Sequence, residues 1–168
     1  MSLGALDVLA AEFERESSAT RRVLLRVPEA HMTWQPHPRS MTLGRLATHI
    51  AELPGWLTHI LAEDAFDLAA IPAAPPCDTT TAAILARFDD CAARARTALR
   101  AATDTALLAR WTLRKDGQEI VSLPRGVAAR TEGLYHLTHH RGQLTVYLRL
   151  LNVPVPALYG PTADEGRL

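Results

Sequence analysis

Apolar residues recur along most of the chain at spacings of three and four, which is the period of one face of an α-helix. Four stretches show this pattern: residues 3–27, a stretch from residue 42 to Ile60, a third from about residue 78 to Leu99, and a fourth from about residue 125 to Leu151. Ser40 or Thr42 can cap the second stretch, and Asp78 or Thr79 can cap the third. The pattern therefore predicts four amphipathic helices.

Three local signals modify this picture. The Pro-Gly pair at residues 54–55 lies inside the second stretch, and because proline removes a backbone donor and clashes one turn back, we expect a kink or bulge there. The Asp-Gly pair at residues 116–117 separates two short runs, residues 111–114 and 118–121, which is typical of a β-hairpin. Asn152, with a proline two residues later, ends the fourth helix.

The chain of 168 residues has the length of one domain and shows no internal repeat. We predict an all-α fold, a single domain over residues 1–168. It is a four-helix bundle with long crossovers and a short β-hairpin between helices 3 and 4. Residues 71–76, rich in proline and alanine, form one of the linkers. In such bundles, cofactor sites are built from inward side chains on facing helices.

Charge and cysteine content exclude several classes of function. Lys and Arg together number 18, as do Asp and Glu, and no basic stripe interrupts this balance, which argues against a nucleic-acid-binding role. Cys77 and Cys91 form no CxxC pair, so neither a zinc ribbon nor a disulfide framework is indicated. No signal peptide and no membrane-spanning segment are recognisable. We therefore expect a soluble, cytoplasmic protein.

The candidate chemistry lies with the histidines. His136 and His140 are four residues apart, which places both rings on one helix face, where they can hold one metal ion. Gln143 and Tyr147 continue that face and could support the ligands. His49 lies inside the apolar face of the second helix, where an imidazole without a partner is costly. Spacing alone leaves an alternative open: surface histidines, or core histidines hydrogen-bonded to carbonyl groups.

The remaining signals narrow the type of site. Three neutral imidazoles would leave coordination positions open, as in catalytic rather than structural sites. Residue 137 is leucine, so the HExxH motif of zinc proteases is absent, and no GxSxG, GxGxxG or P-loop motif occurs. His139 points about 100° away from His140. We expect no metal-binding role for three further histidines, which lie in a loop (His31 and His37) or on the flank of the second helix (His59). No catalytic acid or base can be assigned.

Several motifs together resemble the DinB family, which includes the YfiT-like proteins. They are residues 34–37 (Trp-Gln-Pro-His), residues 42–44 (Thr-Leu-Gly) through His49 to Trp56, the block from His136 to Gln143, residues 147–156, and Tyr159 with Gly160. By position, the family's metal-binding triad falls on His49, His136 and His140. The resemblance implies a divalent transition metal, nickel or zinc, and a homodimer formed through helix faces.

The resemblance also implies a reaction class, because characterised relatives include thiol-dependent S-transferases and a thiol-dependent isomerase. We expect a metal-dependent enzyme acting on a small molecule, with thiol transfer first and metal-assisted hydrolysis second. Neither cysteine is near the triad in sequence, so a low-molecular-weight thiol would come from outside the protein. The alternative is a non-enzymatic, stress-related bundle that the metal only stabilises.

Overall fold

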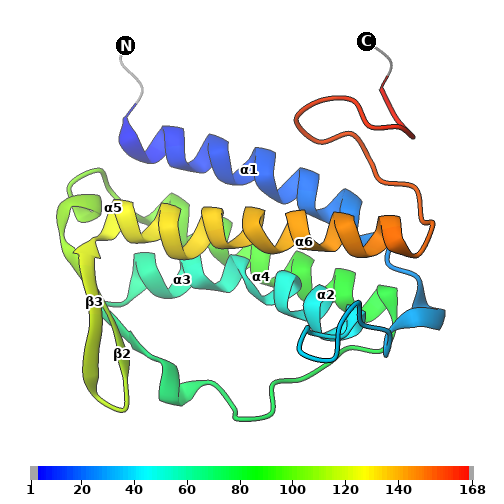
Figure 1. Ribbon diagram of the computed structural model, residues 1–168. Helices are drawn as coiled ribbons and strands as arrows, with labels where there is room; N and C mark the ends of the chain where they lie inside the picture. The colour runs from blue at the N-terminus through cyan, green and yellow to red at the C-terminus, as the bar shows by residue number, and fades with distance from the viewer. Residues whose placement is uncertain (1–3, 167–168) are drawn as a thin grey trace.

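A computed structural model describes residues 4–166 of the chain, which are mostly helical (Figure 1). The main helices are α1 (Ala5–Leu24), α2 (Leu43–Glu52), α3 (Pro54–Ala62), α4 (Thr81–Ala101), α5 (Arg125–Ala128) and α6 (His136–Leu150). Shorter helical segments are the 3₁₀ helices η1 (Glu29–His31), η2 (Leu68–Ala70) and η3 (Ala106–Leu108), and the π-helical segment η4 (Ala129–Tyr135).

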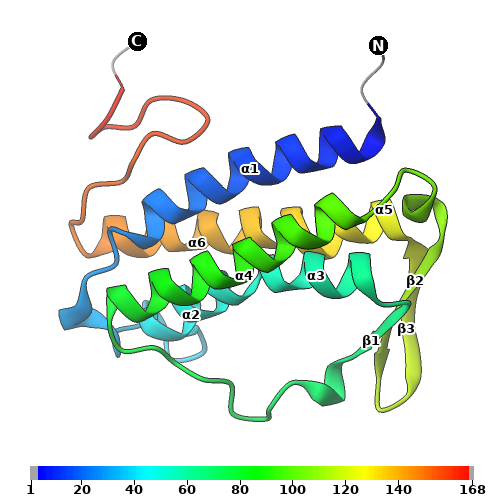
Figure 2. The ribbon, with the colours of Figure 1, turned by 180° about the vertical axis from the view of Figure 1, so that it is seen from behind.

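Four long helical segments lie side by side: α1, α2 with α3, α4, and α5 through η4 to α6 (Figures 1 and 2). Their buried apolar side chains form one core cluster, to which α1 contributes Leu9 and Phe13 and α4 contributes Ile84 and Phe88. The prediction of a mainly helical fold is confirmed. Within residues 4–166, no helix combines the length and apolar character that a membrane crossing requires.

The second helix begins and breaks for the reasons that its sequence suggested. Thr42 caps α2, and its hydroxyl accepts a hydrogen bond from the backbone N–H of Arg45 at 3.2 Å. The expected irregularity at Pro54 is a full break: α2 ends at Glu52, and Pro54 begins α3. Proline is favoured in a first helical turn, because the backbone donor that it lacks would have no partner there.

A small sheet closes one end of the helices. β2 (Arg110–Lys115) and β3 (Gln118–Pro124) pair antiparallel around Asp116 and Gly117, whose φ angles of 51° and 76° are those of the predicted hairpin turn. A third strand, β1 (Ala65–Asp67), pairs parallel with β2, giving the order β1-β2-β3. This strand was not predicted, because three residues are too few to show an alternating pattern.

The fourth predicted helix is continuous but not uniformly α-helical. Its middle, η4, is π-helical and leads directly into α6. At the other end, Asn152 adopts a φ of 57°. The Asn152 N–H donates to the carbonyl of Arg149 at 3.0 Å, and the Val153 N–H donates to that of Leu148 at 2.9 Å. These paired bonds form a Schellman motif, which confirms the predicted end of the helix.

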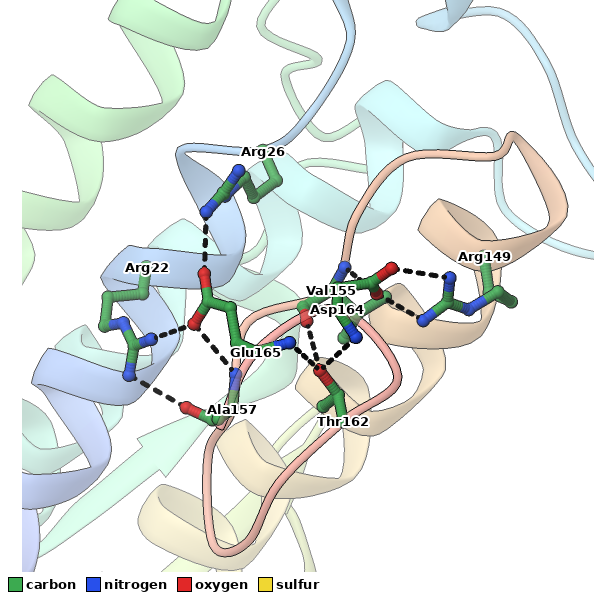
Figure 3. Close-up of polar contacts among 8 residues, drawn as sticks. All are labelled: Arg22, Arg26, Arg149, Val155, Ala157, Thr162, Asp164 and Glu165. Carbon is green, nitrogen blue, oxygen red and sulfur yellow. Dashed lines mark hydrogen bonds and ion pairs between the residues drawn. The ribbon is translucent and has the colours of Figure 1, made fainter. Parts of the chain in front are cut away.

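We call residues 153–166, which follow α6, the C-terminal segment. This segment contacts both α1 and α6. Figure 3 shows that Glu165 accepts hydrogen bonds from Arg22 of α1 and from Arg26, which lies just beyond the end of that helix, while Asp164 pairs with Arg149 of α6. The turn itself is held by Thr162, whose hydroxyl donates to the carbonyl of Val155. The segment therefore ties the first helix to the last.

Candidate metal centre

Two helices that lie alongside each other, α2 and α6, bring three histidines together. His49 comes from α2, and His136 and His140 come from α6. The Nε2 atoms of His49 and His136 are 3.4 Å apart, and one ring nitrogen from each of the three residues lies within 4.8 Å of the others. A tetrahedral ion with metal–nitrogen distances of about 2.0–2.1 Å requires ligand nitrogens about 3.3 Å apart. The donor set therefore fits a transition-metal ion.

A hydrogen bond orients one of the three rings in a way that suits metal binding. His140 Nδ1 lies 2.7 Å from Gln143 Oε1, to which it can donate a proton. This bond leaves the opposite nitrogen of the His140 ring with a free lone pair. Contacts of this kind orient ligands and raise their basicity in metal sites.

The surroundings keep the triad uncharged. Burial is the main cause that lowers the pKa of all three histidines, and the pKa of His49 falls to about 3. For His49 the neighbouring rings of His140 and His136 and the guanidinium of Arg45 lower the pKa further, because a second positive charge would be repelled. The imidazoles are therefore neutral at pH 7, the form that binds metal ions.

The π-helical segment decides which face of α6 is buried. In a continuous α-helix, His136 and His140 would lie on the same buried face as Arg125 and Ala129. The wider π turn contains more residues than an α turn, so the buried face of α6 begins one residue later along the chain. The most buried residues of α6 are accordingly Leu137, Arg141, Leu144, Tyr147 and Leu148. His136 and His140 are half-buried at the edge of the core, and Gln143 is exposed. The helix face that carries His136, His140 and Gln143 is therefore only partly buried.

Tyr147, the other residue expected near the ligands, contacts a different part of the molecule. Its ring packs edge-on against Trp34, with centroids 5.6 Å apart, and its hydroxyl donates to the carbonyl of Met41. It joins α6 to the loop that precedes α2. Its predicted support of the ligands stays a prediction.

A cavity of about 390 Å³ opens beside His49, and we call it the α2–α4 cavity. Its walls come from α2, α3, β1, α4 and the crossover to α4, namely Arg45, His49, Glu52, Gly55, Trp56, His59, Phe66, Ile71, Pro72, Pro75, Pro76, Cys91 and Arg94. Sequence reasoning missed this neighbourhood because its members lie far apart along the chain. The position of Cys91 on the apolar face of the third predicted helix indicated burial but not a place in the same cavity as His49.

The surroundings of Cys91 disfavour the thiolate form that makes a cysteine reactive. Burial raises the pKa of its thiol, although Arg94 donates a hydrogen bond to Sγ at 3.2 Å and partly opposes the shift. The group is therefore a protonated thiol at neutral pH, and a protonated thiol is a poor nucleophile.

Comparison with known proteins identifies the chain's relatives. A sequence model of the DinB family matches residues 1–167. The chain belongs to the DinB family. It is also 27% identical over 161 residues to "Uncharacterized protein YrdA" of Bacillus subtilis (strain 168), which covers 95% of this chain and 91% of that protein.

Two solved structures have the DinB fold seen here. A DinB-like protein from Bacillus cereus ATCC 10987 matches with a TM-score of 0.70 and 22% identity, over 90% of this chain and 95% of that one. The DinB-like protein YjoA from Bacillus subtilis matches with a TM-score of 0.67 and 15% identity, over 88% and 95%. At these identities the likeness supports the fold alone, whereas the family match over residues 1–167 confirms the resemblance drawn from the motifs.

Within the described residues 4–166, the other histidines of this DinB protein do not belong to the group that could hold the metal ion. His37 accepts a hydrogen bond at Nδ1 from the backbone N–H of Arg39 and so orders its own loop. His59 lines the α2–α4 cavity but pairs at 2.8 Å with Glu63, the residue that follows its own helix. His139 is exposed beside His140.

Proposed function

We propose that this DinB protein binds one divalent transition metal, nickel or zinc, through His49, His136 and His140, and uses it for chemistry on a small molecule. One observation carries the proposal: three neutral imidazoles converge from two helices, with one ring nitrogen of each within 4.8 Å of the others. Three protein ligands leave a coordination position open, as in catalytic zinc sites.

The chain's own residues supply the geometry for such a reaction. When bound, a divalent metal would lower the pKa of a coordinating thiol or water and so provide a nucleophile at neutral pH. Gln143 orients the His140 ring. Because Cys91 is protonated by its burial, the thiol of a transferase reaction would come from a separate small molecule. Thiol transfer is the first candidate, and metal-assisted hydrolysis is the second.

A non-enzymatic role is the competing hypothesis. The triad joins α2 to α6, so a bound metal would link two helices of the bundle and stabilise the native state by mass action. In that case the metal would raise the melting temperature without any turnover. The open cavity beside His49 favours the enzyme, because a purely structural ion needs no access for substrate.

Metal content tests the site. The protein is purified without a histidine tag, loaded with nickel or zinc, and dialysed, and its metal content is measured for the wild type, His140→Ala and the control His31→Ala. We expect about one ion per chain in the wild type and the control, and a large loss in His140→Ala. Equal, near-zero content in all three proteins would refute the metal site.

A thiol panel tests the reaction. The metal-loaded protein is incubated with low-molecular-weight thiols and electrophiles such as epoxides, and conjugation is compared with that of His49→Ala. Conjugation that never exceeds the His49→Ala level rules out the transferase and leaves the hydrolase and the stabilised bundle. The homodimer and the cytoplasmic location stay predictions, which size-exclusion chromatography with light scattering and cell fractionation can check.

A further inference from the structure

The α2–α4 cavity has a chemistry of its own, which the metal ligands do not explain. We propose that it binds a small organic anion with an apolar body, whose charged end lies on Arg94 and whose body lies against Trp56 and Phe66. This deepens the proposed function and rests on it for the reaction, but the binding itself needs only the cavity. The volume of about 390 Å³ lies in the range of small-molecule sites.

The apolar part of the site is an aromatic wall that leads to the triad. Trp56 packs against Phe66 with ring centroids 5.3 Å apart, and against His136 with centroids 6.5 Å apart. Ile71 and the prolines of the crossover segment supply further apolar lining, and the prolines restrict the backbone of that segment. In Figure 2 this crossover runs between β1 and the start of α4. An apolar body placed on this wall would lie next to the metal ligands.

The fixed charges of the cavity favour an anion over a cation. Among the described residues that line it, Glu52 alone is acidic. The Glu52 carboxylate already accepts a hydrogen bond from Arg45 at 3.2 Å, and it lies 3.8 Å from Arg87. Its charge is thus compensated within the protein. A cationic ligand would have to compete with two guanidinium groups for this carboxylate.

Arg94 is the cationic group available to a ligand. Its ion-pair partner is Asp90, one turn earlier on α4, at 2.8 Å, and the two side chains are 57% and 62% exposed. Exposed pairs of this kind are weak and rearrange at little cost. Arg45, in contrast, is held by both Glu52 and the carbonyl of Pro76. An anion that enters the cavity would therefore form an ion pair with Arg94. A bound divalent metal, held by three neutral ligands, would add a second positive charge near the anion.

Gly55 allows the cavity to be blocked without disturbing the triad. It lines the cavity, and no described atom lies within 4 Å of the position that a Cβ would take there. Gly55→Phe would therefore place its ring in the cavity. Gly142→Phe is the matched control, because Gly142 is an exposed helical glycine with equally open space and lies outside the cavity lining. Arg94→Gln tests the charge, and Arg100→Gln, an exposed arginine further along α4, is its control.

The experiment compares three probes of nearly equal shape. These are 4-tert-butylbenzoate, 4-tert-butylbenzyl alcohol and 4-tert-butylbenzylammonium, titrated calorimetrically into the full chain with and without zinc. We expect the carboxylate to bind about two- to fivefold more tightly than the alcohol in the zinc-free protein, the effect of one partly exposed charge contact, and the ammonium to bind weakest. Arg94→Gln should remove the preference for the carboxylate, Gly55→Phe should abolish binding of all three, and both controls should behave as the wild type.

Two results would overturn the inference. One is equal binding of the three probes by the wild type, and the other is wild-type binding of the carboxylate by Gly55→Phe or Arg94→Gln. Failure of the proposed function gives a different result: the chain would take up no zinc, while the zinc-free protein would still prefer the carboxylate. If the protein takes up zinc but binds the three probes equally, the metal centre is supported and the anion site is refuted.

Discussion

Among the three candidate ligands, His49 is the residue whose surroundings change its acid–base chemistry most. Its usual pKa of 6.5 falls to about 3 in the native state, chiefly through burial. The native state thus disfavours the protonated ring, while the unfolded chain accepts the proton readily. The stabilising effect is complete above pH 6.5 and is lost as the pH falls from about 6.5 to about 3.

We therefore predict that the metal-free protein loses stability across this pH window and that His49→Gln loses less. The check is urea unfolding in the presence of a chelator at several pH values from 7 to 4, with His31→Gln as the control. Other groups titrate in the same range, so the difference between wild type and variant is the informative quantity. Identical slopes for wild type and His49→Gln would contradict the prediction.

Gln143 shows how an exposed side chain can act through a ligand. Because its carboxamide holds His140 in one tautomer, we expect Gln143→Ala to weaken zinc binding by about 10- to 100-fold, the usual effect of losing such a partner. The stability of the metal-free protein should change little, since Gln143 is exposed. Competition with a chelating dye measures the affinity, and Gln118→Ala, on β3, is the control. Unchanged affinity would show that the contact does not orient the ligand.

At the scale of elements, the last helical stretch combines two glycines with opposite expected behaviour. A Cβ on Gly133, in the π-helical segment, would lie 3.0 Å from Cδ2 of the buried Leu57, whereas one on Gly142 would meet no described atom within 4 Å. The π segment thus approaches α3 closely at the turn before His136. A larger residue would separate the two elements and shift the ligand.

We predict that Gly133→Ala destabilises the protein by about 1–3 kcal/mol through overpacking, while Gly142→Ala stabilises it by up to about 1 kcal/mol through helix propensity. Both changes can be measured by denaturant unfolding of the metal-free protein. Equal effects of the two substitutions would mean that the close packing of η4 against α3 contributes nothing.

The elements themselves were predictable where a local signal defines them. Thr42 caps α2, and Asp116 with Gly117 forms the turn between β2 and β3, because each depends on backbone geometry within a few residues. At Pro54 the sequence predicted only a kink or bulge, whereas the structure has a full break between α2 and α3. β1 and η4 were not predictable in the same way. A three-residue strand depends on a partner strand more than 40 residues away, and a π turn depends on packing that the spacing of apolar residues does not encode.

At the scale of the whole molecule, one buried arginine links three distant parts of the chain. Arg141 is 1% exposed and pairs with Glu16 of α1 at 2.6 Å, and Tyr159 of the C-terminal segment hydrogen-bonds to both. Arg141 also donates to the hydroxyl of Thr20. Because it follows His140 directly, this link fixes the rotation of α6 and with it the direction of the candidate ligand.

We predict that Glu16→Ala destabilises the protein by about 3 kcal/mol, because it leaves the buried guanidinium without its carboxylate. Glu14→Ala, two residues earlier, removes an exposed pair with Arg96 and should cost less than about 1 kcal/mol. Thermal and urea unfolding of the two variants provide the comparison. If both variants lose the same small amount, Arg141 is solvated in some other way and does not hold α6.

The sequence by itself determined the helical period, the caps and turns, the family motifs and the choice of three histidines out of seven. These features follow from interactions within one or two helical turns or from motifs that can be read directly. Only the tertiary structure decided that α2 and α6 bring the three rings to one point, that the π segment turns them to the edge of the core, and that Cys91 and Arg94 share a cavity with His49. Such placements depend on how whole helices rotate and pack against one another, and a shift of one residue in one helix changes which side chains meet.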